Sequence, residues 1–231
     1  MHRPIAAAPP ARTTRRGSSD LTDLRPCPAC DSAQAEHLAR QSFEVLDGSL
    51  VNGYDVVCCR VCGTAYASDL PSAKEFDTYY AAMSKYEDEI TSYFSSPEDL
   101  ARCESIVDRV ERHDPEHRLS VLDVGCSTGA LLAAFQRRGY QDLEGVDPSP
   151  ACSTYARRAH DILVRTGTAS DVADLPRQYG LVILSSVLEH LLDPLQALRD
   201  AWQVLEDDGL LFLEVPDVEG FAATARAPFQ E

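Results

Sequence analysis

Residues 122–129 read LDVGCSTG, and this stretch decides the fold. An apolar segment at residues 119–124 is typical of a buried strand, and a helical pattern follows over residues 130–138 and ends at Gly139. Glycines at such a junction let the backbone turn tightly and approach a ligand closely. The free amides at the start of the helix can then bind an anion, so the stretch predicts a nucleotide-type binding site.

Strand and helix patterns alternate along the rest of the chain. We expect further strands at residues 143–146, 161–164, 181–185 and 210–215, and helices that begin near Ser149 and Asp193. In the second helix Leu195, Leu198, Trp202 and Leu205 recur on one face, which predicts that this face is buried. The alternation is typical of a parallel sheet, so the predicted fold class is α/β.

A carboxylate follows the second strand. Asp147 comes 18 residues after Gly129, which is close to the length of one helix and one strand. A carboxylate at this place can accept two hydrogen bonds from ribose hydroxyls. The glycines form the pattern G-x-x-x-G (Gly125 and Gly129), which differs from the G-x-G-x-x-G of dinucleotide-binding proteins.

At these residues the sequence resembles the class I S-adenosylmethionine-dependent methyltransferases. The resemblance spans residues 120–217 and rests on the glycine stretch, Asp147, the segment SSVLEHL at residues 185–191 and the strand at residues 209–216. It implies a Rossmann-like sheet with strands one to five present, and S-adenosylmethionine as the cofactor. The cofactor-binding residues that it implies are Asp123, Gly125, Cys126, Ser127 and Gly129 at the methionine end, Asp147 at the ribose, Thr168 and Asp171 near the adenine, and Ser185. We interpret Cys126 as a packing residue rather than a nucleophile, because no base stands near it in the sequence.

Four of the eight cysteines form two C-x-x-C pairs, Cys27 with Cys30 and Cys59 with Cys62. Each pair places two thiolates on one tight turn, and two such turns supply a closed tetrahedral set of ligands for a structural Zn²⁺. Between the pairs we expect a hairpin, with strands at residues 42–51 and 54–58 around a turn at Asn52-Gly53. Residues 25–70 are therefore predicted to form a zinc ribbon, and reactive or disulfide-bonded pairs are the alternative.

Composition narrows the class of partner. The chain has 21 Lys and Arg against 37 Asp and Glu, a net charge of −16, which disfavours nucleic acid and favours a small-molecule substrate. No apolar run is long enough to span a bilayer, and the cysteine pattern without a secretory signal indicates a reducing compartment, the cytoplasm. Residues 1–24 are expected to form a disordered tail, with an organelle transit peptide as the alternative.

The order of segments carries a second resemblance. A helical linker or lid with several tyrosines is expected at residues 71–117, before the cofactor-binding domain at residues 118–231. Its Ser96-Pro97 reads as a helix start, with Leu100, Cys103, Val107 and Val110 on one face. A four-cysteine ribbon before such a domain resembles the zinc-binding-domain methyltransferases that include the C-methyltransferases of deoxysugar biosynthesis.

This resemblance implies methyl transfer to a carbon next to a ketone on a nucleotide-linked sugar, after a base removes a proton from that carbon. The base of that family is expected soon after strand five, about where the chain ends at Glu231. The last two strands of a seven-stranded sheet are missing as well. We therefore expect a truncated product, a fragment or a degenerate relative.

Glu189 and His190 form the one acid–imidazole pair near the predicted pocket, and they are the candidate catalytic residues. The pair could instead hold a metal ion, as a similar segment does in some ubiquinone-pathway O-methyltransferases, which carry another acid where Ser186 stands, or it could serve in helix capping and packing. Two other functions stay open. One is a zinc-ribbon RNA methyltransferase, and the other is a non-catalytic protein that binds the cofactor or a partner.

Overall fold

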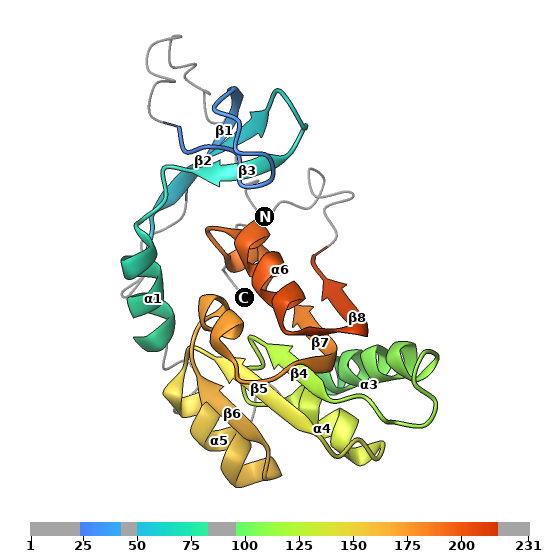
Figure 1. The fold of residues 1–231 in the computed structure, drawn as a ribbon. Helices are drawn as coiled ribbons and strands as arrows, with labels where there is room; N and C mark the ends of the chain where they lie inside the picture. Colours follow the sequence, from blue (N-terminus) through green and yellow to red (C-terminus); the bar gives the residue numbers. More distant parts are fainter. Residues whose placement is uncertain (1–23, 43–49, 83–95, 217–231) are drawn as a thin grey trace, which may run out of the picture.

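The structure is a computed structural model that describes residues 24–42, 50–82 and 96–216. It consists of a small antiparallel module, a connecting helix and a larger α/β domain (Figure 1). The tail expected over residues 1–24 lies outside the described residues except for its last residue, and so do residues 83–95 of the expected linker. Among the described residues, no helix is both long enough and apolar enough to cross a bilayer.

A five-stranded parallel sheet forms the centre of the larger domain. The strand order is β6 (Leu163–Thr166), β5 (Leu143–Asp147), β4 (Val121–Val124), β7 (Tyr179–Ser185) and β8 (Leu205–Glu214). Every neighbouring pair is parallel. The strand order reverses at β4, because β4 pairs with β5 on one side and with β7 on the other. Open α/β sheets bind ligands at such a point, beside the carboxyl ends of the strands. The predicted α/β, Rossmann-like sheet is confirmed.

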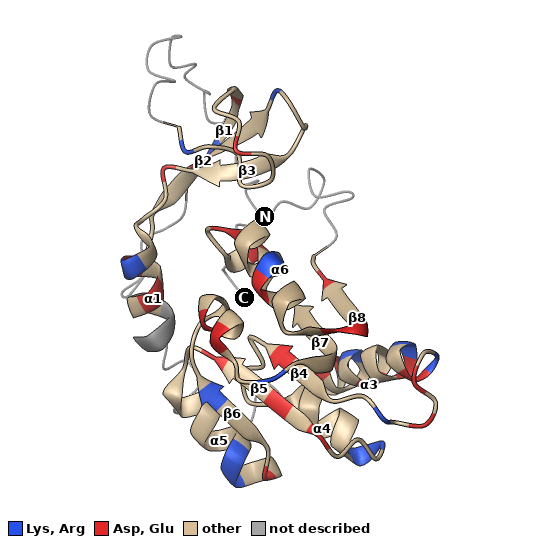
Figure 2. Cartoon of the chain, viewed as in Figure 1, with Lys and Arg blue, Asp and Glu red and all other residues tan. Residues whose placement is uncertain are grey.

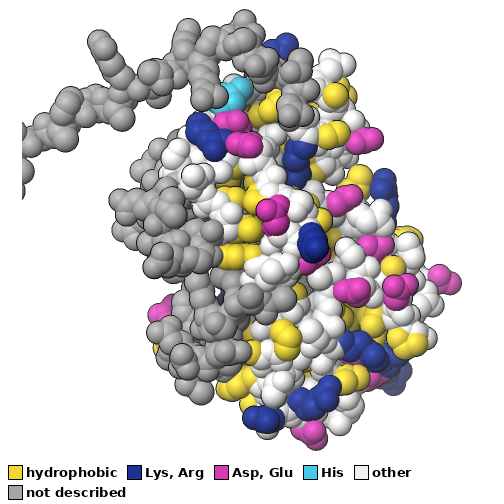
Figure 3. Space-filling model, turned by 90° about the vertical axis from the view of Figure 1, so that its left-hand side faces the viewer, with side chains coloured by type: hydrophobic (Ala, Val, Ile, Leu, Met, Phe, Trp, Pro, Cys, Tyr) yellow, Lys and Arg dark blue, Asp and Glu magenta, His cyan; other side chains and the backbone are white. Residues whose placement is uncertain are grey.

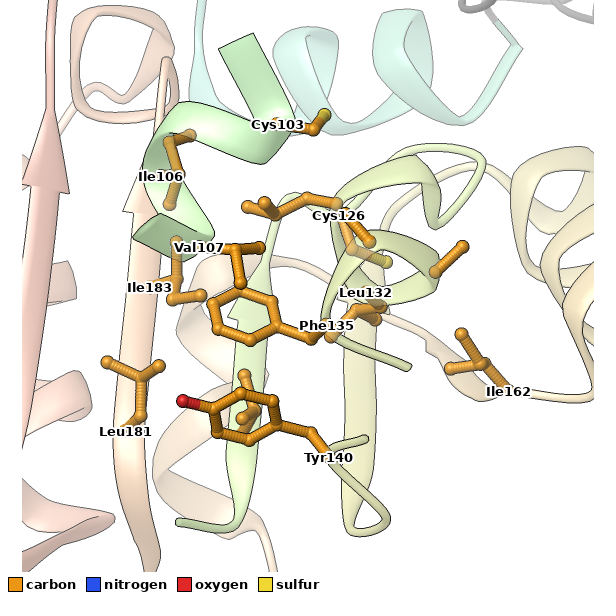
Figure 4. Close-up of a cluster of buried hydrophobic side chains, with 14 of the residues drawn as sticks. Cys103, Ile106, Val107, Cys126, Leu132, Phe135, Tyr140, Ile162, Leu181 and Ile183 are labelled. Carbon is orange, nitrogen blue, oxygen red and sulfur yellow. The ribbon is translucent and has the colours of Figure 1, made fainter. Parts of the chain in front are cut away.

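Helices cover both faces of this sheet (Figure 1). One face carries α3 (Pro97–Glu111), α4 (Ala130–Arg137) and α5 (Pro150–His160), and the other carries α6 (Pro194–Gln203) and the 3₁₀ helix η1 (Ala169–Asp174). On the first face the Phe135 ring lies beside Val107 of α3 and Ile183 of β7 (Figure 4). Phe135 and Tyr140 meet edge to face, with their ring centroids 5.0 Å apart. Buried apolar side chains therefore cover both faces of the parallel sheet.

The predicted start of α3 is confirmed, because the Ser96 side chain accepts a hydrogen bond from the Asp99 amide at 3.0 Å. Cys103, Val107 and Val110 are buried as expected, whereas Leu100 is 40% exposed. The buried side chains of α3 are part of the sheet's own core. The helix therefore packs against the parallel sheet as part of the α/β domain, although its residues fall in the range 71–117 that the sequence predicted to be a linker or lid.

The buried face of α6 differs from the expected one. Trp202 is 70% exposed, and the buried residues of the helix are instead Ala197, Asp200 and Ala201. Two alanines four positions apart let the helix approach η1 and the sheet closely, which leaves no room for an indole. Leu205 does not belong to the helix but begins β8, five residues before the strand start predicted from the sequence.

The N-terminal module is a three-stranded antiparallel sheet of β1 (Ala35–Ser42), β2 (Gly53–Cys59) and β3 (Ala65–Ser68). The prediction of a two-residue turn at Asn52-Gly53 is wrong, because β1 ends at Ser42 and Ser42 pairs with Gly53. Residues 43–49 of the strand predicted at residues 42–51 lie outside the described residues. Gly53 serves a close approach between strands instead. A Cβ atom there would come within 2.2 Å of the Gln41 carbonyl oxygen. α1 (Ala73–Ala82) follows the module.

Candidate functional site

The glycine stretch forms a loop at the carboxyl end of β4. Gly125, Ser127 and Gly129 all have left-handed backbone conformations, with φ of +74°, +50° and +79°. The Gly125 amide donates to the Val146 carbonyl on β5 at 2.7 Å, which ties the loop to the neighbouring strand. A Cβ atom on Gly125 would lie 2.5 Å from Val187 Cγ2. Glycine is therefore required there both by conformation and by space.

Asp147 braces this loop from the end of β5. Its Oδ2 accepts a hydrogen bond from the Ser127 amide at 2.8 Å, and its Oδ1 accepts one from the Ser149 amide at 2.9 Å. Burial raises the pKa of Asp147, and the two amide hydrogen bonds act in the opposite direction. One carboxylate thus fixes both the glycine loop and the start of α5, and each oxygen keeps a further lone pair for a ligand hydroxyl.

Asp123 at the end of β4 is 3% exposed. Burial, followed by the nearby charge of Asp147, raises the pKa of Asp123 to about 8, while Arg102 lowers it. This shift favours the protonated form of the carboxyl group near neutral pH in the ligand-free protein. A cation that arrives beside Asp123 would favour the ionised form, so the site is suited to a positively charged group.

A charged cluster that the sequence did not predict lies at the same edge of the sheet. Arg102 Nη1 on α3 donates to Ser185 Oγ at 2.7 Å and to Glu214 Oε2 at 2.5 Å. Ser185 Oγ also donates to Glu214 Oε2, at 2.5 Å. Ser185 and Glu214 end β7 and β8, so the cluster joins the carboxyl ends of two strands to α3. The acid inside the apolar run of β8 was the available signal for Glu214, but nothing in the sequence distinguishes Arg102 from Arg109, the other arginine of α3.

Cys126 and Gly129 shape the loop by packing. Cys126 is 6% exposed, and its Sγ lies 2.5 Å from the position that a Cβ atom on Gly145 would occupy. Burial raises the pKa of the Cys126 thiol well above its ordinary value, which makes it a poor nucleophile. A Cβ atom on Gly129 would lie 3.1 Å from Ala156 Cβ, so this glycine lets α4 approach α5.

Thr168 and Asp171 form a capping box at the start of η1. The Thr168 amide and hydroxyl donate to Asp171 Oδ2 at 2.6 and 2.9 Å. Both residues follow β6, at the carboxyl edge of the sheet. The Asp171 carboxylate is thus engaged with its own helix start, and it orders the segment beside Asp147.

Glu189 and His190 lie on the 3₁₀ helix η2 (Leu188–His190), directly after Val187, which contacts the glycine loop. Glu189 Oε1 and His190 Nε2 are 4.0 Å apart, and both side chains are partly exposed. In the described part of the chain, no third potential ligand lies close enough to complete a metal site with this pair. The His190 side chain is 37% exposed, and Val187, three residues earlier, is the residue that meets the glycine loop.

The four cysteines of the two C-x-x-C pairs meet in the N-terminal module. Cys27 Sγ lies 3.6 Å from Cys62 Sγ, and Cys30 Sγ lies 3.6 Å from Cys59 Sγ. All four sulfur atoms lie within 4.8 Å of one another. A tetrahedral zinc ion with bonds of about 2.3 Å would separate its sulfur ligands by about 3.8 Å, whereas a disulfide needs about 2.05 Å. The donor set and its spacing fit a zinc ion.

The two cysteine turns have the same local geometry. In each, the residue after the second cysteine is left-handed, Asp31 with φ of +59° and Gly63 with φ of +77°. The amides of Asp31 and Gly63 donate to the carbonyls of Cys27 and Cys59 at 2.8 and 3.0 Å. Cys58 is not part of the cluster, since its thiol lies 3.6 Å from the Gly63 carbonyl oxygen. Cys59 is therefore the member of the adjacent pair that faces the other three thiols.

Comparisons with known proteins agree with the fold of the α/β domain. The ubiquinone biosynthesis O-methyltransferase of Azorhizobium caulinodans is 32% identical over 104 residues, which are 43% of this chain and 41% of that protein. The chain thus spans less than half the length of this curated relative. Two solved structures share the fold: the plantazolicin methyltransferase with bound S-adenosylhomocysteine (TM-score 0.51, 16% identity, 68% of this chain and 65% of that one) and a protein of Pyrococcus horikoshii (TM-score 0.51, 20% identity, 61% and 69%).

A family model described as a methyltransferase domain matches residues 67–230, which are most of the chain and include the whole parallel sheet. The residues that carry the glycine loop, Asp147 and η2 all fall inside this match. The chain belongs to the methyltransferase domain family.

Proposed function

We propose that this chain binds S-adenosylmethionine at the carboxyl ends of β4 and β5 and transfers its methyl group to a small molecule. The observation that carries the proposal is the hydrogen bond of 2.8 Å from the Ser127 amide to Asp147. This bond fixes the left-handed glycine loop beside a carboxylate whose oxygens keep lone pairs for a ligand. Such a site suits the ribose and the methionine part of the cofactor. Asp123, whose pKa is raised to about 8, would face the cationic end of the cofactor.

Calorimetric titration of S-adenosylhomocysteine tests this site. Asp147→Asn should weaken binding by about tenfold or more, because an amide group cannot accept both backbone hydrogen bonds and a ribose hydroxyl. Asp142→Asn is the matched control. Asp142 precedes the same strand at its opposite end and pairs with Arg177 at 2.6 Å, away from the loop. Equal loss in both variants, or no binding by the folded wild type, would contradict the proposal.

The acceptor that we propose is a nucleotide-linked deoxysugar or a related natural-product intermediate, methylated on carbon. The four-cysteine module before the methyltransferase domain supports this class, and the net charge of −16 argues against RNA. His190, which is partly exposed, is the candidate base, with Glu189 next to it. We also propose that the cysteines hold a structural Zn²⁺ in a reducing compartment, the cytoplasm, since zinc needs them as thiolates.

O-methylation is the second candidate, because the Azorhizobium relative is named for an O-methyltransferase. The chain would be incubated with a nucleotide-linked keto-deoxysugar or with a catechol, each with S-adenosylmethionine that carries a ¹³C-labelled methyl group. Carbon-bound and oxygen-bound methyl groups have well-separated ¹³C chemical shifts. A carbon-bound methyl group on the sugar, lost in His190→Gln with cofactor binding intact, is the expected result. An oxygen-bound methyl group on the catechol alone would overturn the C-methylation proposal.

A further inference from the structure

A hollow of about 340 Å³ lies between α5 and the edge strand β6, outside the glycine loop. Its lining consists of Pro150, Ser153, Thr154, Arg157, Arg158, Val164, Arg165 and Thr166. The volume is at the lower end of the range for small-molecule sites. No Asp or Glu contributes to the lining, although acids outnumber bases in the chain by 37 to 21. The residues that line the hollow therefore carry a net positive charge, although the chain as a whole is acidic.

Two of the three arginine charges at this hollow are available to a ligand. Arg165 pairs with the buried Glu144, but Arg157 and Arg158 are exposed and form no ion pair with another described residue. Lys and Arg positions lie on both α5 and β6 (Figure 2). Basic side chains also gather on the lower part of the surface in Figure 3, which views the molecule from the side of α1, α5 and β6. Two adjacent guanidinium groups would repel each other less with an anion between them.

Neutral donors lie beside these charges. The Gly167 amide donates to the Asp147 carbonyl on β5, and N–H groups alternate in direction along a strand, so the amides of Thr166 and Val164 point to the free edge of the sheet. The Thr166 hydroxyl lies in the same wall, but it donates its proton to Ser153 Oγ at 3.1 Å, so the backbone amides are the neutral donors here. Guanidinium groups together with backbone amides form a donor set that binds phosphate oxygens.

From these observations we propose that the hollow between α5 and β6 binds a multiply charged phosphoryl group, such as a diphosphate, separately from the cofactor site. The lining disfavours cations, which would meet three arginines, and apolar ligands, which would desolvate two charged groups. The phosphoryl group could belong to free pyrophosphate or to a nucleoside diphosphate.

Inorganic pyrophosphate would be titrated into the ¹⁵N-labelled full chain, with S-adenosylhomocysteine present to fill the cofactor site. Saturable shifts should centre on the amides of Val164, Arg165 and Thr166. The double variant Arg157→Gln/Arg158→Gln should bind at least about tenfold more weakly, because charge-assisted hydrogen bonds supply the affinity. Arg109→Gln/Arg112→Gln is the matched control, since it removes the same charge from exposed positions on and just after α3.

Absence of saturable shifts at β6, or equal weakening in both double variants, would overturn the proposal. A repeat with uridine diphosphate identifies the source of the phosphoryl group: tighter binding than pyrophosphate, with shifts at the same amides, assigns the ligand to nucleotides, and equal binding assigns it to free phosphoanions. Amide shifts do not depend on methyl transfer. The result is therefore separate from any failure of the proposed enzymatic activity.

Discussion

The two sheets of this protein are stabilised in different ways. The parallel sheet has clusters of 17 and 10 buried hydrophobic residues on its two faces, whereas the core of the antiparallel module consists of Cys27, Val57, Cys59 and Tyr66. Two of these four are the buried members of the cysteine cluster. Burial of apolar side chains stabilises the parallel sheet, and so small a core cannot offset the chain entropy of the module without help. The difference predicts that the module needs the proposed Zn²⁺ to stay folded, whereas the α/β domain does not.

The largest expected effect is the loss of the module on removal of zinc. A chelator, or Cys59→Ser, should unfold residues 25–70 and leave the α/β domain folded, because metal binding supplies the folding free energy of such modules. Amide NMR spectra would show loss of dispersion confined to the module. Cys58→Ser is the control, since Cys58 lies outside the cluster. A module that keeps its spectrum without metal would remove the distinction between the two sheets.

A matched pair of glycines tests a second difference between the α/β domain and the module, which is the space around a left-handed glycine. Gly125 and Gly63 have nearly the same φ, +74° and +77°, but an added Cβ atom meets Val187 at 2.5 Å in the first case and nothing within 4 Å in the second. Gly63→Ala should therefore cost only the backbone strain, about 1 kcal/mol. Gly125→Ala should cost about 1–3 kcal/mol more in the free energy of unfolding and abolish binding of S-adenosylhomocysteine. Urea denaturation and calorimetry measure both, and equal costs would show that the loop tolerates a side chain.

The buried acid Asp123 gives the parallel sheet a pH dependence of its own. The pKa of Asp123 is raised to about 8, so the folded state holds a proton that the unfolded state releases near pH 4. Stability should then fall as the pH rises from about 4 to about 8, since the folded state binds more protons over that window. Asp123→Asn should flatten this slope and raise the melting temperature at pH 8. A slope that persists in the variant would assign the effect to another group.

The part of the fold that the sequence predicted is the part governed by local patterns. The strand–glycine–helix junction, the Ser96 cap and the two cysteine turns depend on residues close together in the chain, and each has the predicted form. The hairpin and the buried face of α6 depend on partners elsewhere. Gly53 belongs to the Asn52-Gly53 hairpin signal, but in the structure it allows a close contact between β1 and β2. Ala197 and Ala201 form the buried face of α6 because this helix packs against η1.

The candidate site divides in the same manner. The position of Asp147 at the end of β5 could be predicted because it follows from one strand–helix–strand length, whereas its contact with a ribose stays a prediction. The cluster of Arg102, Ser185 and Glu214 joins residues up to 112 positions apart, which no local pattern encodes. Thr168 and Asp171 were expected near the adenine, and the structure shows them bonded to each other in a capping box. Their contact with a cofactor stays a prediction.

The smallest expected effect concerns Trp202, the one tryptophan of the chain. Its 70% exposure predicts a fluorescence emission maximum close to that of the unfolded chain, and Trp202→Ala should change the free energy of unfolding by less than about 0.5 kcal/mol. Phe135→Ala, a fully buried ring in the same domain, should cost about 3–5 kcal/mol. A blue-shifted emission in the native protein would mean that another surface covers the indole. The exposed face of α6 would then be an interface, and the contrast between a self-sufficient sheet and a metal-dependent module would hold for only part of the α/β domain.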